Sequence, residues 1–377
     1  MKNFKIVFLF LFFPSIIIVS CTSRTTDSVT FQNVLESFYF ENPDLIGIMV
    51  HIEAPDKNIS WSGAVGLSDK NDTIKIDPDQ PMLIASNTKT YVSAAILRLV
   101  EQGKLSLDSA IDTLISETSQ KTLSNDGYNL KNIQIKHLLS HTSGIFDYND
   151  SKTMSEKVNQ QPDYKWTRAE QIKLAADEGE PLAEPAEMFK YSDTNYLLLT
   201  EIIEKLTGKV FYTSMRELLK FDQFDLSNTW FYSLEDSLVQ TKPLIYQYNR
   251  TWNTSTKTES PTFDLYGGGG LATTTSDLAI FTHLLFTGKI FDNPETSNLL
   301  YTRIETKEPN QSHYMLGIKE FEIMGETVYG HSGFWGTATR YFPEENITFS
   351  ISLSNNIDRD KDVEKLLEKL LEELKDL

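Results

Sequence analysis

The sequence predicts an α/β fold of the α+β type, in which an antiparallel sheet is built from both chain ends and flanked by helices. Three observations support this prediction. Strand-like runs lie near both ends, helical patterns fill the middle, and an amphipathic helix closes the chain. The middle is then a mostly helical insertion between the two halves of the sheet. A cleft between the sheet and the insertion is the natural place for a functional site.

The predicted strands come from both ends of the chain. Ile46 to Ile52 is a short apolar run, and Ile59 to Val65 alternates before a glycine. From Asn346 to Ser354, apolar residues alternate strictly with small polar ones. Such alternation is typical of a strand with one buried and one polar face. We therefore expect this last strand to be half-buried.

Helical patterns dominate between about residues 87 and 260. One example is Tyr196 to Leu206, which Gly208 ends. The C-terminal segment carries a single apolar stripe, as a helix on a core does. Its members are Val363, Leu366, Leu367, Leu370, Leu371 and Leu374. We expect one domain over residues 30–377, with an α/β region (about 30–85 and 265–377) around a helical region (about 86–264).

The first twenty residues are predicted to be a signal peptide. Lys2 and Lys5 precede a short apolar stretch that ends in small residues before Cys21. The segment Ile18-Val19-Ser20-Cys21 resembles a bacterial lipobox, which implies acylation of Cys21 and a polar tether over residues 21–29. The alternative is a stray cysteine near a cleavage site. The expected location is the bacterial cell envelope, with a membrane-anchored lipoprotein facing the periplasm.

Charge and cysteine content exclude several classes of protein. The net charge of −18 argues against a nucleic-acid partner and against a basic membrane-binding patch. Cys21 is the only cysteine, so no disulfide can form within the exported part. The charge does not identify a substrate.

The first candidate site is Ser86 with Lys89, at the start of an apolar helical stretch. One helical turn places residues i and i+3 side by side. The positive end of the helix dipole and burial both disfavour a charged Lys89, so it could accept the proton of Ser86. The first turn also offers backbone N–H groups for an oxyanion. The alternative is a capping serine with a chance lysine.

Two further motifs follow. Tyr191-Ser192-Asp193 precedes a helical stretch, and Gly330-His331-Ser332-Gly333 ends a predicted strand. Taken singly, the first is better explained as a helix N-cap and the second as a strand-end turn with a surface histidine.

Together, the three motifs resemble those of the serine β-lactamase and D-Ala-D-Ala carboxypeptidase superfamily, in particular its class C β-lactamase-like branch. That family carries Ser-x-x-Lys, Tyr-x-Asn and Lys/His-x-Gly in this order. The stretches IKHLLSHTSGI (135–145), LLTEIIEKLTG (198–208) and GGGGLATTTSDLAIF (267–281) also resemble the branch. The resemblance covers roughly Ile46 to Leu353 and implies a β-lactamase/transpeptidase-like fold.

The resemblance also implies roles for individual residues. Ser86 resembles the nucleophile of an acyl-enzyme, and Lys89 with Tyr191 resembles the general-base pair. The backbone N–H groups of Ser86 and Phe334 match the oxyanion hole. The residues that match the substrate-binding strand are His331, Ser332 and Gly333. From their position, Phe334 and Trp335 are expected to crowd the pocket.

Two residues depart from the family pattern. Asp193 stands where Asn is usual, and an ionised Asp only accepts hydrogen bonds. It would favour the ammonium form of Lys89 and leave Tyr191, its phenolate favoured by that lysine, as the better base. His331 replaces the lysine usual in β-lactamases, and offers a weaker, pH-dependent charge to a substrate carboxylate. This argues against an efficient β-lactamase.

The sequence therefore predicts a serine hydrolase that acts on a small molecule or peptide without a cofactor. His137 and His141 have no further ligand cluster beside them, so no metal is expected. The preferred substrate is a D-amino-acid peptide related to peptidoglycan, cleaved as by a DD-carboxypeptidase. Three alternatives stay open: a carboxylesterase, a weak β-lactamase, and a penicillin- or muropeptide-binding sensor without turnover.

Overall fold

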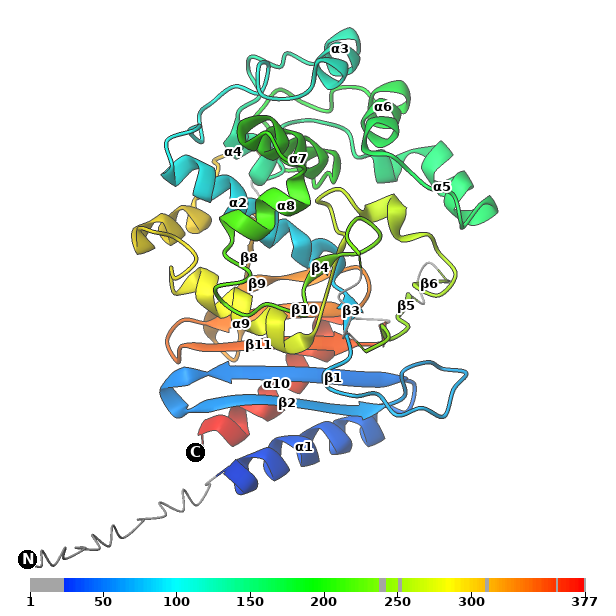
Figure 1. Cartoon of the computed structure of the whole chain (residues 1–377), viewed down its shortest axis with the longest axis vertical. Helices are drawn as coiled ribbons and strands as arrows, with labels where there is room; N and C mark the ends of the chain where they lie inside the picture. Colours follow the sequence, from blue (N-terminus) through cyan, green and yellow to red (C-terminus); the bar gives the residue numbers. More distant parts are fainter. Residues whose placement is uncertain (1–23, 237–241, 250–252, 309–311, 357–358, 376–377) are drawn as a thin grey trace, which may run out of the picture.

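A six-stranded antiparallel sheet forms the base of the molecule (Figure 1). The computed structural model describes residues 24–236, 242–249, 253–308, 312–356 and 359–375. The strand order is β2-β1-β11-β10-β9-β8, so the first two strands of the chain pair with the last ones. The sheet built from both chain ends is thereby confirmed. Its strands are β1 (Gly47–Ala54), β2 (Ile59–Gly66), β8 (Lys319–Ile323), β9 (Glu326–Gly333), β10 (Thr337–Phe342) and β11 (Ile347–Leu353).

Helices cover both faces of this sheet. α1 (Arg24–Glu41) and α10 (Arg359–Lys375) share one apolar cluster with alternate residues of β1, among them Ile48 and Val50. Met49, which points to the opposite face, joins the cluster that contains α9 (Thr275–Phe286). Since successive strand residues point to opposite faces, the sheet separates two cores.

The strand predicted from Asn346 to Ser354 is present as β11, but the prediction that it is half-buried is wrong. All seven residues of β11 are buried. Ile351 and its apolar neighbours face α1 and α10, while the polar side packs beneath α9. His283 of α9 contacts Thr348 there, with 3.2 Å between Nδ1 and Oγ1. Alternation indicates two chemically different faces, but a covering helix can bury both.

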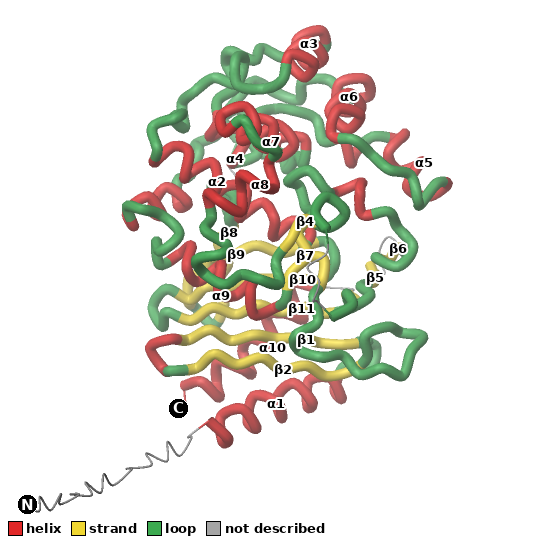
Figure 2. The backbone as a smooth tube through the Cα atoms, in the orientation of Figure 1, coloured by secondary structure: helices red, strands yellow, loops and turns green. Residues whose placement is uncertain are grey.

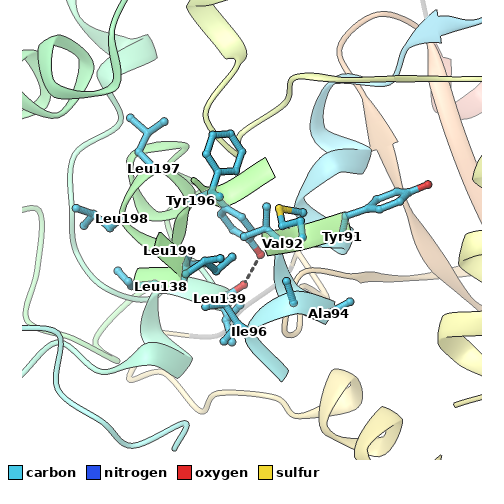
Figure 3. Packing of buried hydrophobic residues seen from close by; sticks show 14 of the residues in the cluster. Tyr91, Val92, Ala94, Ile96, Leu138, Leu139, Tyr196, Leu197, Leu198 and Leu199 are labelled. Atoms are coloured by element: carbon cyan, nitrogen blue, oxygen red, sulfur yellow. Dashed lines mark hydrogen bonds between the residues drawn. The ribbon is translucent and has the colours of Figure 1, made fainter. Parts of the chain in front are cut away.

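The helical region lies above the sheet (Figure 2). Its central helices, α2 and α7, are almost entirely buried, and the hydroxyl of Tyr196 donates to the Leu139 carbonyl at 3.0 Å (Figure 3). The helices are α2 (Thr88–Glu101), α3 (Glu117–Asn125), α4 (Ile135–Leu139), α5 (Lys152–Gln160), α6 (Arg168–Glu178), α7 (Thr194–Thr207) and α8 (Phe211–Leu218). The expected helical character of this region is confirmed, and Gly208 ends α7 in the left-handed conformation with φ 72°.

Short elements connect the two regions. Six two- or three-residue strands form two small sheets, and three of these strands lie inside the segment 86–264 that was expected to be helical. They are β3 (Met82–Leu83), β4 (Trp230–Phe231), β5 (Tyr248–Asn249), β6 (Thr254–Ser255), β7 (Leu271–Thr273) and β12 (Asn355–Asn356). The 3-10 helices are η1 (Pro55–Lys57), η2 (Ala85–Asn87), η3 (Tyr148–Asp150), η4 (Pro261–Asp264) and η5 (Pro294–Tyr301).

The start of α1 differs from the expected tether. The helix begins at Arg24, inside the segment 21–29, because Ser, Thr and Asp are well tolerated in a first helical turn. Cys21 and the predicted signal peptide lie outside the described residues. Within the described residues, no helix combines the length and apolar character needed to cross a bilayer.

Candidate active site

Ser86 lies in a tight turn where the sheet meets the helical region. It belongs to the 3-10 helix η2, directly before α2, and its side chain is partly exposed. The preceding residue, Ala85, has φ +47°, a conformation that costs an L-residue about 1–3 kcal/mol and that clusters at functional sites. The first residue of α2 follows two positions later, and neither η2 nor α2 has a side-chain cap. Ser86 is therefore not the capping serine of the alternative reading.

The turn is fastened to the end of the sheet. Asn87 donates from Nδ2 to the Ile84 carbonyl at 3.2 Å and to Thr337 Oγ1 of β10 at 2.9 Å. Thr337 in turn donates to the same carbonyl at 2.9 Å. At Gly333 of β9, a Cβ atom would lie only 2.2 Å from the Ile84 carbonyl oxygen. Only glycine allows β9 to approach this closely, which fixes the strand beside Ser86.

Lys89 points at Ser86 from the first turn of α2. Its ammonium donates to Ser86 Oγ at 2.9 Å and to the Gly268 carbonyl at 2.6 Å. The same Nζ lies 2.7 Å from Asp193 Oδ1, and Lys89 is fully buried. Three oxygen atoms thus surround the Lys89 nitrogen and fix the position of the side chain.

The charge of Lys89 differs from the first expectation. Burial alone lowers its pKa, but the negative charge of the adjacent Asp193 outweighs burial and raises the pKa above its ordinary value. Lys89 is therefore an ammonium at neutral pH. The expectation that Asp193 favours this form is confirmed, and the neutral amine expected from the helix start is wrong for the resting site.

Tyr191 borders the same space. The Lys89 nitrogen lies 5.0 Å from its ring centroid. Desolvation raises the pKa of Tyr191 to about 12, although Lys89 and a hydrogen bond with Ser86 act in the opposite direction. The phenol is therefore protonated in the resting state, and the phenolate expected from the neighbouring lysine is the minor form at neutral pH.

Asp193 lies close enough to two further carboxyl groups, those of Asp147 and Asp264, for the three to interact electrostatically. Asp193 accepts from Asn149 Nδ2 at 2.9 Å, opposite the lysine. Burial raises the pKa of Asp147 to about 8, with a further contribution from Asp193. Burial also raises the pKa of Asp264 well above its usual range. Asp147 therefore keeps its proton at neutral pH. Asp193 forms the ion pair with Lys89.

The end of β9 forms the opposite wall. His331 Nε2 lies 3.0 Å from the hydroxyl of Tyr314. Ser332 Oγ donates to Asp360 Oδ1 at 3.0 Å and accepts from Arg340 Nη2 at 3.1 Å. The pairing of β8 with β9 ends opposite Gly330, before this segment.

These elements enclose a cleft of about 370 Å³. Of the residues predicted from sequence, it brings together Ser86, Tyr191, His331, Ser332 and Phe334. Lys89 and Asp193 lie directly behind Ser86. Its full lining is Ser86, Phe189, Tyr191, Ser312, Tyr314, Lys319, Phe321, His331, Ser332, Phe334 and Asp360.

A family model described as Beta-lactamase matches residues 43–373, a range that contains every residue of this cleft. The chain belongs to the beta-lactamase family. It is a serine hydrolase with the mixed α/β fold of that family, as the sequence resemblance implied.

Individual curated relatives match only part of this chain. The protein flp of Staphylococcus aureus strain COL is 35% identical over 145 residues, which are 38% of this chain and 26% of that protein. The chain thus matches about a quarter of the length of this curated relative.

Solved structures show the same fold. The D-amino acid amidase from Ochrobactrum anthropi SV3, complexed with D-phenylalanine, has a TM-score of 0.76 at 20% identity and covers 93% of this chain and 99% of its own. The penicillin-binding protein from Bacillus halodurans has a TM-score of 0.70 at 20% identity and covers 89% and 98%.

The expectation drawn from the position of Trp335 in the sequence needs correction. Trp335 does not crowd the cleft beside Phe334. It is buried in a small apolar cluster with Leu83, Ala85 and Trp230, behind the turn that carries Ser86. Its aromatic ring lies 4.8 Å from that of Phe334, so it supports the cleft wall from outside.

His141 is a site residue that the sequence reasoning treated as structural. It is fully buried, and its ring centroid lies 4.1 Å from that of Tyr191. The Ser192 amide donates to its Nδ1 at 3.2 Å. Burial, Lys89 and His331 lower its pKa well below the ordinary value, so His141 is neutral and positions Tyr191 by packing. Within the described ranges, no group of three potential ligands for a metal is found.

Proposed function

We propose that Ser86 is the nucleophile of an acyl-transfer hydrolase. The observation that carries this proposal is the 2.9 Å contact between Lys89 Nζ and Ser86 Oγ in a cleft of substrate size. A serine hydroxyl needs a group that removes its proton. Among the described residues, the titratable side chains that contact this hydroxyl are Lys89 and Tyr191. The N–H groups of Ser86 and Phe334 are proposed to hold the oxyanion.

Proton movement follows from the protonation states of the site. The Tyr191 phenolate takes the proton of Ser86 as Oγ attacks the substrate carbonyl, and passes it to the leaving group. Lys89, kept as an ammonium by Asp193, stabilises the phenolate during this step. In the second half, water gives a proton to Tyr191 and its oxygen attacks the ester carbonyl. The bond between the acyl carbon and Ser86 Oγ then breaks, Tyr191 returns the proton to Oγ, and the acid is released.

The proposed substrate is a small peptide or amide that contains a D-amino acid. The three ordered motifs and His331 in place of lysine support this class over an efficient β-lactamase. Solved structures of the same fold include the D-amino acid amidase described above and a D-stereospecific amidohydrolase from Streptomyces sp.. The DD-carboxypeptidase reaction is one form of this chemistry and requires a place for a terminal carboxylate.

A single experiment separates the candidate activities. The domain is incubated with a fluorescent penicillin and, separately, with a short-chain ester, and its intact mass is followed over time. Persistent acylation supports a peptidase or a sensor, whereas rapid turnover of one reagent supports a β-lactamase or an esterase. Ser86→Ala must abolish every modification. If wild type and Ser86→Ala behave identically, the assignment of the nucleophile is wrong.

We also propose that the protein is exported and anchored through acylated Cys21. The support is the lipobox-like segment after a signal-like apolar stretch. Cys21→Ser should move the protein from the membrane fraction to the soluble fraction of the envelope. Equal membrane association of both forms would contradict the anchor.

A further inference from the structure

A carboxylate from the C-terminal helix occupies the end of the cleft. Asp360 of α10 accepts a hydrogen bond from Ser332 Oγ at 3.0 Å, and both residues line the same cleft as Ser86. The Asp360 side chain is 41% exposed, so its charge faces the cleft rather than the core. In the family resemblance, the segment around His331 and Ser332 is where a substrate carboxylate would bind. In this chain an internal carboxylate already lies there.

The nearest strong cation is committed to the protein. Arg340 is 1% exposed, and its Nη1 donates to the carbonyls of His331 and Thr339 at 3.1 and 2.8 Å. Its Nη2 donates to Ser332 Oγ, and the guanidinium stacks on Phe321 at 3.5 Å from the ring centroid. Arg340 thus holds Ser332 and forms an ion pair with Asp360, with 3.5 Å between Nη2 and Oδ1. Asp360 lines the cleft, and Arg340 is not among the residues that do.

Among the described residues, Lys319 is the lysine that lines the cleft itself. Its ammonium lies over Phe321, 5.1 Å from the ring centroid. It belongs to β8, opposite Gly330 rather than opposite Ser332. A carboxylate that bound through Lys319 would therefore bind beside the strand segment that carries Ser332, and not next to Asp360.

We infer that Asp360 is a specificity-determining residue that rejects a substrate carboxylate at Ser332 and admits a neutral or cationic group there. The inference rests on the proposed function and narrows it. An ionised carboxylate repels a second one and cannot donate a hydrogen bond to it, and such like-charge contacts act as selection against a ligand. The fitting substrates are D-amino-acid amides, or peptides with further residues beyond the one that binds at Ser332. Peptides whose C-terminal carboxylate would lie at Ser332 fit poorly.

Two ligands that differ only in charge test this inference. N-acetyl-D-Ala-D-Ala and its C-terminal amide have nearly the same shape, but only the first carries a carboxylate. Their dissociation constants are measured by calorimetry on Ser86→Ala, which cannot turn them over. We expect the amide to bind more tightly, and Asp360→Asn in the same background to shift the affinity ratio toward the acid on the order of tenfold.

Glu368→Gln is the matched control. It removes one negative charge from the same helix at an exposed position outside the cleft, so the ratio should not change. Tighter binding of the acid by the Asp360-containing protein, a ratio unaffected by Asp360→Asn, or binding of neither peptide would each overturn the inference. If the acid binds more tightly and Lys319→Met removes that preference, Lys319 is the carboxylate receptor instead. Failure of the proposed function has a different signature, because it appears as the absence of Ser86-dependent acylation.

Discussion

Lys89 and Asp193 form a buried ion pair in which the lysine nitrogen lies 2.7 Å from Oδ1 of the aspartate. The pair lies directly behind the hydroxyl of Ser86. In a lysine-assisted serine hydrolase, this pairing decides which group can accept the serine proton. A charged lysine cannot do so, and in the proposed mechanism the task passes to Tyr191, whose phenol has a pKa of about 12.

Asp193→Asn should accelerate acylation of Ser86 at pH 7 by roughly tenfold or more, since one pKa unit is a factor of ten in the deprotonated fraction. Asp193 raises the pKa values of both Lys89 and Tyr191. Its neutralisation moves both values down, so more of the basic form exists at neutral pH. In wild type, the acylation rate should rise with pH through the alkaline range, and the variant should reach its plateau at lower pH.

The measurement is the rate of ester or penicillin acylation between pH 6 and pH 10. Asp150→Asn is the control, because it removes a half-exposed carboxylate that pairs with Lys190 nearby. If Asp193→Asn acylates more slowly and its pH profile is not shifted, the prediction is wrong. Asp193 would then matter mainly because it positions Lys89, and not because its charge raises the pKa values of Lys89 and Tyr191.

Local patterns in the sequence predicted the sheet and the central helices correctly. Alternation and apolar stripes depend on neighbouring residues, so β1, β2, β11, α7 and α10 lie where the patterns indicated. The two-residue strands β4, β5 and β6 were missed, because so short a run has no detectable period. The polar face of β11 is buried because α9 packs on it, and the sequence pattern of β11 alone cannot predict that contact.

In the candidate site, too, local relationships could be predicted from the sequence and long-range ones could not. Adjacency of Ser86 and Lys89 followed from a spacing of three residues. His141, in the turn that follows α4, packs on Tyr191, and Asp360 of α10 contacts Ser332. No motif connects either pair. Long-range contacts of this kind are what a single sequence does not reveal.

Lys89→Ala and Tyr191→Phe should each slow acylation by ~10²–10⁴-fold, the usual contribution of general acid–base catalysis. The two variants should differ in their pH profiles. Tyr191→Phe removes the proposed base, so the alkaline rise should disappear. Lys89→Ala keeps the phenol but removes the ammonium that stabilises its phenolate, so the rise should move to higher pH. Rates equal to wild type in either variant would remove that residue from the mechanism.

Asp147→Asn should stabilise the fold more at pH 8 than at pH 4. Burial raises the pKa of Asp147 to about 8 in the folded protein, against about 3.9 when unfolded. Between these values the unfolded state releases the proton and the folded state keeps it, so wild-type stability falls as pH rises. The variant has no such loss, and Asn can still accept the bond from the Asn149 amide.

The free energy of unfolding of both proteins is measured in urea at pH 4, 6 and 8. The difference between variant and wild type should grow by about 5 kcal/mol over this range, since each of the roughly four pKa units between the two states corresponds to about 1.4 kcal/mol. Asp108→Asn serves as a comparison at an exposed carboxylate. A difference that stays constant from pH 4 to pH 8 would contradict the buried, protonated state of Asp147.

Gly333→Ala should lower the rate of acylation by roughly a hundredfold, because a misplacement of about 1 Å can have that effect. The added Cβ would lie 2.2 Å from the Ile84 carbonyl oxygen and 2.3 Å from Thr337 Oγ1. Neither atom can yield without moving the turn that carries Ser86, since both also belong to the hydrogen bonds that fasten it. Overpacking of this kind should also lower the free energy of unfolding by about 1–3 kcal/mol. Denaturation in urea separates the two effects. A folded variant with the full acylation rate would mean that β9 and the turn do not need their close approach for catalysis.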